Sequence, residues 1–232
     1  MRTRRRRRMP RRRRRAPNAL SGGRVSRVPR GAHGYRGTVA VQRAIMADTS
    51  YVRMVYCEQY VRANAGPETY VWSHNSIHDP DFTGTGHQPR GHDEWAMFYR
   101  RYYVYAARCE VSIANTGITP VIAVLSATAQ NNGNYANIAR GVEQPNTRHV
   151  IVPRDNRTPA KLSYYITTSE LIGHNTAYER DYAPTFGLDP NTRTFFRFGL
   201  DTMPAINAKE VEFHVKITYY VRLDERVVLP DS

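Results

Sequence analysis

The first 47 residues contain no aspartate or glutamate, and the whole chain contains only three lysines. The positive charge of this N-terminal segment therefore comes from its 16 arginines. Since the whole chain carries +14, residues 48–232 contain 18 basic and 20 acidic residues, a net charge of −2. The charge is concentrated at one end of a nearly neutral body, a pattern that favours binding to a polyanion.

Cysteines, long apolar runs and catalytic motifs are also scarce. The two cysteines, Cys57 and Cys109, lie far apart without metal-ligand spacing, which predicts half-buried reduced thiols in an intracellular protein. The best apolar run, 121–125, is far short of the roughly 18 residues that span a bilayer, and no apolar region follows the basic end as in a secretory signal. Without a phosphate loop, nucleophile elbow or Cys–His pattern, we expect no enzyme, cofactor or membrane insertion.

Residues 1–47 form a basic arm that we expect to be disordered. Like charges repel along it, and few large apolar groups offset the entropy of ordering. Pro10, Pro17, Pro29 and the turn at 21–23 would interrupt any helix. When extended, the arm would reach at most roughly 150 Å.

Arginine, rather than lysine, indicates phosphate as the partner of the arm, because guanidinium grips phosphate bidentately and stacks on bases. Full neutralisation on single-stranded nucleic acid would give a salt slope approaching about −11, with little sequence preference. The candidate nucleic-acid-binding residues are Arg4, Arg5, Arg6, Arg7, Arg8, Arg11, Arg12, Arg13, Arg14, Arg15, Arg24, Arg27, Arg30, Tyr35, Arg36 and Arg43.

A basic arm can have two other uses. Docking on anionic membranes is disfavoured, because the arm has no lipidation motif and no amphipathic apolar face. Nuclear import suits arginine-rich runs, and we expect it on the same residues as nucleic-acid binding. The candidate import signal is Arg4, Arg5, Arg6, Arg7, Arg8, Arg11, Arg12, Arg13, Arg14 and Arg15.

The body, residues 48–232, shows the period-two alternation of β-strands. In 211–223, seven apolar or aromatic residues fall on one face and six other residues on the opposite face, which predicts one buried and one solvent face. In 103–113 the same alternation places Tyr103 and Tyr105 on the same face of the strand as Cys109. Further strands are expected at 51–62, 119–127, 148–152, 161–168 and 194–200.

Long polar connections separate these strands, at 64–93, 130–146 and 169–191. We expect one short helix near 92–100 and an eighth strand within 178–188. Eight antiparallel strands with long connections favour an all-β jelly-roll sandwich. An immunoglobulin-type sandwich fits less well, because the Cys…Trp…Cys pattern is missing.

An arginine-only arm followed by a jelly roll resembles the capsid proteins of circoviruses and related small circular single-stranded DNA viruses. Residues 97–104 (MFYRRYYV) resemble the start of that family's third strand region. Residues 194–198 (TFFRF) and 213–223 (FHVKITYYVRL) resemble its last two strands. The likeness covers the architecture but only these short stretches by residue. The arm-plus-jelly-roll plan is shared with plant satellite-virus coat proteins, which leaves RNA as an alternative to DNA.

The resemblance implies a capsid protein of an icosahedral T=1 shell, with about sixty copies and inward-pointing arms. Its partners would be single-stranded DNA, further copies of itself, host nuclear-import receptors and an unidentified attachment receptor. Its places would be the virion and the host nucleus. Two non-viral alternatives remain, a monomeric nucleic-acid-binding protein and a β-sandwich lectin with a basic tail.

Several residues of the body invite functional readings. His74, His78, Asp79, Asp81, His87, His92, Asp93 and Glu94 crowd one region, which we interpret as a polar loop rather than a metal site. A calcium ion between subunits, held by Asp79 or Asp81, is the minor alternative. We expect Trp72 and Trp95 in core or subunit contacts.

Aromatic and basic residues of the arm and the body could reach nucleic acid at the inner wall of a shell. The candidates for base stacking are Tyr35, Tyr51, Tyr56, Tyr102 and Tyr103. For Tyr51 and Tyr103 the strand alternation favours the core instead. Arg53, Arg100 and Arg101 would line the same wall or form surface salt bridges.

Overall fold

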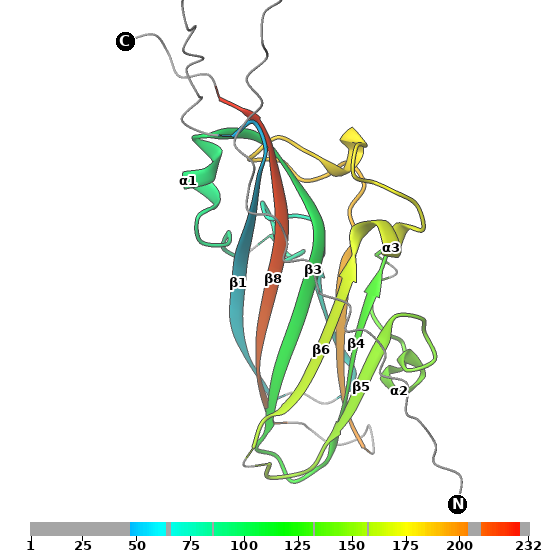
Figure 1. Ribbon diagram of the computed structural model, residues 1–232. Coiled ribbons are helices and arrows are strands. Elements are labelled where there is room, and N and C mark those ends of the chain that lie inside the picture. Colours follow the sequence, from blue (N-terminus) through cyan, green and yellow to red (C-terminus); the bar gives the residue numbers. More distant parts are fainter. Residues whose placement is uncertain are drawn as a thin grey trace, which may run out of the picture. The chain divides into compact units, whose positions relative to one another are not determined.

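Eight strands of the described residues form two four-stranded antiparallel sheets packed face to face (Figure 1). The computed structural model describes residues 47–63, 66–84, 86–131, 133–156, 158–203 and 210–227. The candidate binding and import arginines, the last of which is Arg43, and Tyr35 lie outside the described residues. The expectation of a disordered arm concerns residues that also lie outside them, except for Ala47.

The first sheet has the strand order β1 (Ser50–Arg62), β8 (Val211–Arg226), β3 (Tyr99–Asn115) and β6 (Ala160–Thr167). The second has the order β2 (Glu68–Ser73), β7 (Phe195–Thr202), β4 (Val121–Thr128) and β5 (Thr147–Val152). Every connection between consecutive strands, except the one from β4 to β5, thus crosses from one sheet to the other, and the first and last strands pair side by side. This arrangement confirms the expected jelly roll.

The core lies between the two sheets and is built by strict alternation. Every second residue of β8 from Val211 to Leu223 is at most 2% exposed, as its sequence pattern predicts. Trp72, Phe198 and Phe213 make ring contacts with Tyr60 and Tyr70 in this layer. Because aromatic side chains bury the largest areas, this cluster holds the two sheets together.

The eighth strand is not in 178–188, where we expected it, but is β2, inside the expected loop 64–93. Six residues are too few to show a clear alternation, and β2 becomes a strand by pairing with β7. Segment 178–188 instead contains the 3₁₀ turn η1 (Arg180–Tyr182) and Pro184, which has no N–H to donate.

In the described part of the chain, three short α-helices lie in the connections (Figure 1): α1 (His92–Ala96), α2 (Ile138–Gly141) and α3 (Thr168–Ile172). The helix expected at 92–100 ends at Ala96, because Tyr99 already pairs with Arg226 in the sheet. The helices α2 and α3 were not expected; Asn137 and Thr167 cap their first turns by accepting backbone hydrogen bonds.

A β-bulge in β3 overturns the expected placement of its tyrosines. The register of β3 against β8 shifts between Val104 and Ala106, so that Tyr105 is an extra residue. Before the bulge Tyr102 and Val104 point into the core, and after it Ala107 and Cys109 do. Tyr103 and Tyr105 therefore lie on the opposite face from Cys109.

His74, directly after β2, joins the two sheets through both ring nitrogens. Nε2 lies 3.1 Å from the carbonyl oxygen of Ile166 in β6, and Nδ1 lies 2.9 Å from the hydroxyl of Thr194 before β7. Since a carbonyl only accepts, Nε2 carries the proton and Nδ1 accepts from Thr194. Complete burial lowers the pKa of His74 to about 4.

This buried histidine predicts a pH-dependent stability. Below its ordinary value of 6.5 the unfolded chain protonates His74 while the folded chain does not, so stability falls as pH drops from 6.5 to about 4. A His74→Gln variant keeps a donor for the Ile166 carbonyl but cannot titrate. The difference in free energy of unfolding between the two proteins should change over this window, by on the order of 3 kcal/mol. Denaturant melts at several pH values measure it; a constant difference contradicts the assignment.

Candidate nucleic-acid interface

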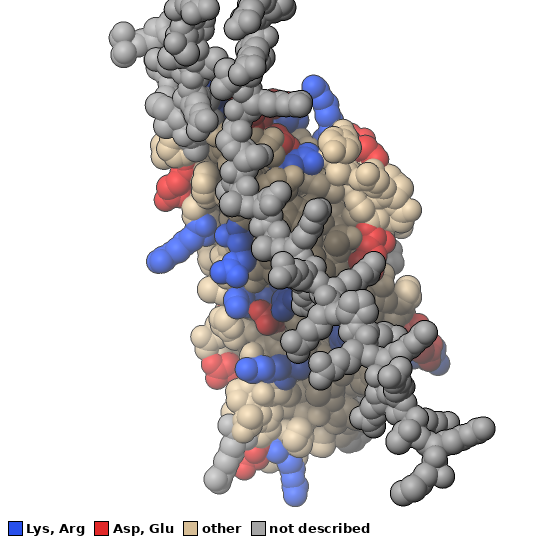
Figure 2. Space-filling view, in the orientation of Figure 1, with Lys and Arg blue, Asp and Glu red and all other residues tan. Residues whose placement is uncertain are grey.

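The solvent face of the β1-β8-β3-β6 sheet gathers basic side chains (Figure 2). One region of this face extends from the cross-strand pair Tyr51–Arg222 to the pair Val55–Thr218. Its outward-facing residues include Arg53 and Arg108 but no carboxylate. Neither Arg53 nor Arg108 has an ion-pair partner among the described residues. This part of the face is therefore cationic.

Four tyrosine rings, which we call the tyrosine row, cross this cationic region from β1 to β6. Their order is Tyr51, Tyr105, Tyr220 and Tyr165, and the three successive centroid distances are 6.0, 6.2 and 5.9 Å. The guanidinium of Arg108 lies 5.6 Å from the ring centre of Tyr165. Partial burial, together with the three neighbouring phenols, raises the pKa of Tyr105.

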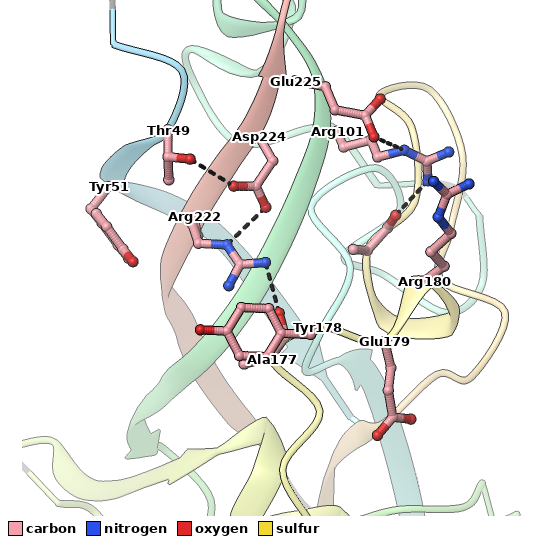
Figure 3. A pocket seen from close by; sticks show the side chains of 11 residues that line it. Thr49, Tyr51, Arg101, Ala177, Tyr178, Glu179, Arg180, Arg222, Asp224 and Glu225 are labelled. Atoms are coloured by element: carbon pink, nitrogen blue, oxygen red, sulfur yellow. Dashed lines mark hydrogen bonds and ion pairs between the residues drawn. The ribbon is translucent and has the colours of Figure 1, made fainter.

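A hollow of about 600 Å³ adjoins the row at the end of the sheet where β1 begins (Figure 3). Its walls come from the starts of β1 and β3, the end of β8 and the loop before β7; they include Tyr51, Tyr178, Arg101, Arg180 and Arg222. Arg101 pairs with Glu225 at 3.0 Å. Arg180 is exposed and has no carboxylate ion-pair partner among the described residues, but Glu179, Asp224 and Glu225 also line the hollow, so its formal charges balance.

Arg222 ties the loop containing Tyr178 to the sheet (Figure 3). It donates to the Ala177 carbonyl oxygen at 2.7 Å and pairs with Asp224 at 2.8 Å. Its guanidinium also lies over the rings of Tyr103 and Tyr178, at 4.9 and 5.8 Å from their centres. Arginine alone combines these planar contacts with several donors.

The structure separates the tyrosines that the sequence grouped as candidates. Tyr51 is 69% exposed, so its expected place in the core was wrong. Tyr103 is buried, but beneath the loop at 176–178 rather than between the sheets; its hydroxyl bonds to that of Thr176. Tyr56 and Tyr102 are core residues without exposed surface, which removes them as stacking residues.

Sequence reasoning missed Tyr105, Tyr165 and Tyr220 as candidates. Tyr165 and Tyr220 follow the alternation of their own strands, but only the strand order shows that they are neighbours. The three arginines expected at the inner wall or in surface salt bridges lie in different places. Arg53 lies in the cationic region, whereas Arg101 lines the hollow and forms the salt bridge with Glu225. Arg100 is exposed near the start of β3.

The histidine- and aspartate-rich region is held by contacts within the protein. Asp81 accepts from the backbone and hydroxyl of Thr83, both at 2.9 Å, and Asp79 lies 3.7 Å from Arg193. His92 is buried against Phe186. In the part of the chain that the structure describes, no three His, Cys, Asp or Glu side chains gather as a metal site.

The two cysteines differ from the expected half-buried pair: Cys57 is exposed and Cys109 is buried, and both are free thiols. Burial raises the pKa of Cys109.

Trp72 lies in the core and Trp95 packs against the core cluster, as expected. No helix among the described residues is long and apolar enough to span a membrane.

No family model matches this chain, and no curated protein matches it. Solved structures with similar folds include a mud crab tombus-like virus, with 9% identity, 94% of this chain and 96% of that chain covered, and a TM-score of 0.47. A 60-mer BFDV capsid protein has 11% identity, coverage of 79% and 97%, and a TM-score of 0.46. Desmodium yellow mottle tymovirus has 7% identity, with 85% of this chain and 100% of that chain covered, and a TM-score of 0.45. At such low identity and TM-score, the likeness decides nothing about function.

Replacing Arg222 by lysine should release the loop at 176–178. Lysine retains a charge for Asp224 but cannot keep the stacking on Tyr103 and the bond to the Ala177 carbonyl together. We expect faster amide hydrogen exchange in this loop and a loss of about 1–2 kcal/mol in the free energy of unfolding. The matched control is Arg53→Lys, on the same face but without an ion pair, which should change neither quantity.

Proposed function

We propose that this chain is the coat subunit of a small icosahedral virus. Copies of it would assemble into a closed shell of about sixty subunits, and the arginine segment would condense single-stranded DNA inside. The observation that carries the proposal is the division of charge: 16 arginines without an acid in residues 1–47, joined to a jelly-roll body of net charge −2.

The charge division suits a container for a polyanion. Sixty arms of +16 would supply on the order of 10³ positive charges, comparable with the phosphates of a genome of similar nucleotide count. A nearly neutral body limits nonspecific adhesion of the outer surface. Residues 1–47 would act as the packaging arm and residues 48–232 as the shell domain.

The body supplies features that shell formation needs. Jelly rolls pack two sheets into rigid blocks, and they are used by viral capsid and lectin domains alike. The long connections at 74–98 and 173–194 brace each other: Ser76 bonds to Asp189 at 2.5 Å, and Asn75 bonds to the Thr192 carbonyl at 2.8 Å. Braced loops of this kind would provide contacts between subunits and the outer surface.

The arm would also direct the newly made protein to the host nucleus. Arginine runs of five residues match what import receptors read, and two of them occur at 4–8 and 11–15. Packaging and import would use the same side chains at different times. The protein would therefore be located in the virion and in the host nucleus. The outer surface of the shell would attach to the host cell.

Deleting residues 1–43 should abolish packaging while leaving the body folded, because residues 44–232 form a compact unit with their own core. Electron microscopy and the 260/280 nm absorbance ratio of purified particles measure this. Full-length protein should yield shells near 20 nm that contain nucleic acid. Nuclease treatment of their contents separates DNA from RNA. A truncated protein that still enclosed nucleic acid at physiological salt would refute the arm's role, and a full-length monomer would refute the shell.

Replacing the ten arginines at 4–8 and 11–15 by serine should leave a fluorescent fusion in the cytoplasm. Replacement by lysine keeps the charge and should preserve nuclear accumulation, which makes it the matched control. The ratio of nuclear to cytoplasmic fluorescence reports the result. Unchanged nuclear signal in the serine variant argues against an import signal in this segment.

A further inference from the structure

The tyrosine row lies outside the core of the body. Tyr51 and Tyr165 are 69% and 47% exposed, and all four rings lie on the face turned away from the core. No hydrogen bond to their hydroxyls occurs among the described residues, whereas the hydroxyls of Tyr102 and Tyr219, for example, bond to backbone carbonyls. A row of partly exposed rings on an open sheet face, with hydroxyls free to bond elsewhere, offers a surface for a ligand.

The chemistry of the row fits unpaired bases. Aromatic rings on an open sheet stack bases of any sequence, since every base has a π face. Arg108 and Arg53 lie beside the rings, so phosphates would meet cations along the row. An apolar ligand would make no use of these arginines, and a double helix would hide its bases from the rings.

We propose that the tyrosine row of the β1-β8-β3-β6 sheet stacks unpaired bases of single-stranded nucleic acid, as a second contact beside the arginine segment. This inference rests on the proposed packaging function. The arm would neutralise phosphates, and the row would hold bases by contacts that salt does not screen. In a closed shell this sheet face would point toward the enclosed strand.

The test separates base contacts from phosphate contacts in the full-length chain. Fluorescence anisotropy at about 0.5 M salt, where phosphate contacts are weakened, compares oligo(dT) with an abasic strand of equal length, and oligo(U) with oligo(dT). Wild-type protein should bind oligo(dT) at least about tenfold more tightly than the abasic strand. Binding of oligo(U) as tight as that of oligo(dT) would show that the stacking is independent of the sugar.

Tyr51→Leu with Tyr165→Leu should remove most of this preference, because leucine retains apolar bulk but cannot stack. The corresponding double phenylalanine variant should keep it. Tyr164→Leu is the matched control: Tyr164 lies on the same strand but packs toward the core. Equal binding of oligo(dT) and the abasic strand by wild type, or an unchanged preference in the double leucine variant, overturns the inference.

Photocrosslinking on unaltered protein makes the test independent of whether the leucine variants fold. A strand containing 5-iododeoxyuridine should crosslink to Tyr51 or Tyr165, identified by mass spectrometry. Crosslinks confined to residues 1–47 overturn the inference while leaving the packaging arm intact. If even the abasic strand fails to bind at low salt, the proposed packaging function itself fails.

Discussion

The pairing of β8 between β1 and β3 is the constraint on which the rest of the structure depends. In a strand, successive side chains point to opposite faces, so the apolar half of β8 must fill the space between the sheets. A shift of one residue would expose Phe213 and Tyr219 and bury Lys216. This register therefore fixes two surfaces at once: a closed aromatic core and an open face of polar, basic and tyrosine side chains.

The bulge in β3 changes how that open face is used. Without it, Tyr103 and Tyr105 would share the inward face of Cys109; with it, both turn outward. Tyr105 then links Tyr51 to Tyr220, which completes the row across four strands. Bulges commonly redirect a side chain in this way near functional sites.

The arginine segment and the sheet face would divide the work of holding a strand. Charge on the arm acts over a Debye length and weakens as salt rises. Ring stacking needs direct contact and carries no charge to be screened. The braced connections at the end of the sheet, where Arg222 fixes the loop with Tyr178, leave the hollow beside the row open.

The sequence by itself determined the charge division, the strand class and seven of the eight strands to within a few residues, because alternation and composition are local properties. It also identified the buried face of β8 and the jelly-roll plan. Only the tertiary structure decided that β2 is a strand, because a six-residue segment depends on its partner β7. Likewise, only strand order and the bulge bring Tyr51, Tyr105 and Tyr165 together, since the chain between them gives no signal of cross-strand proximity.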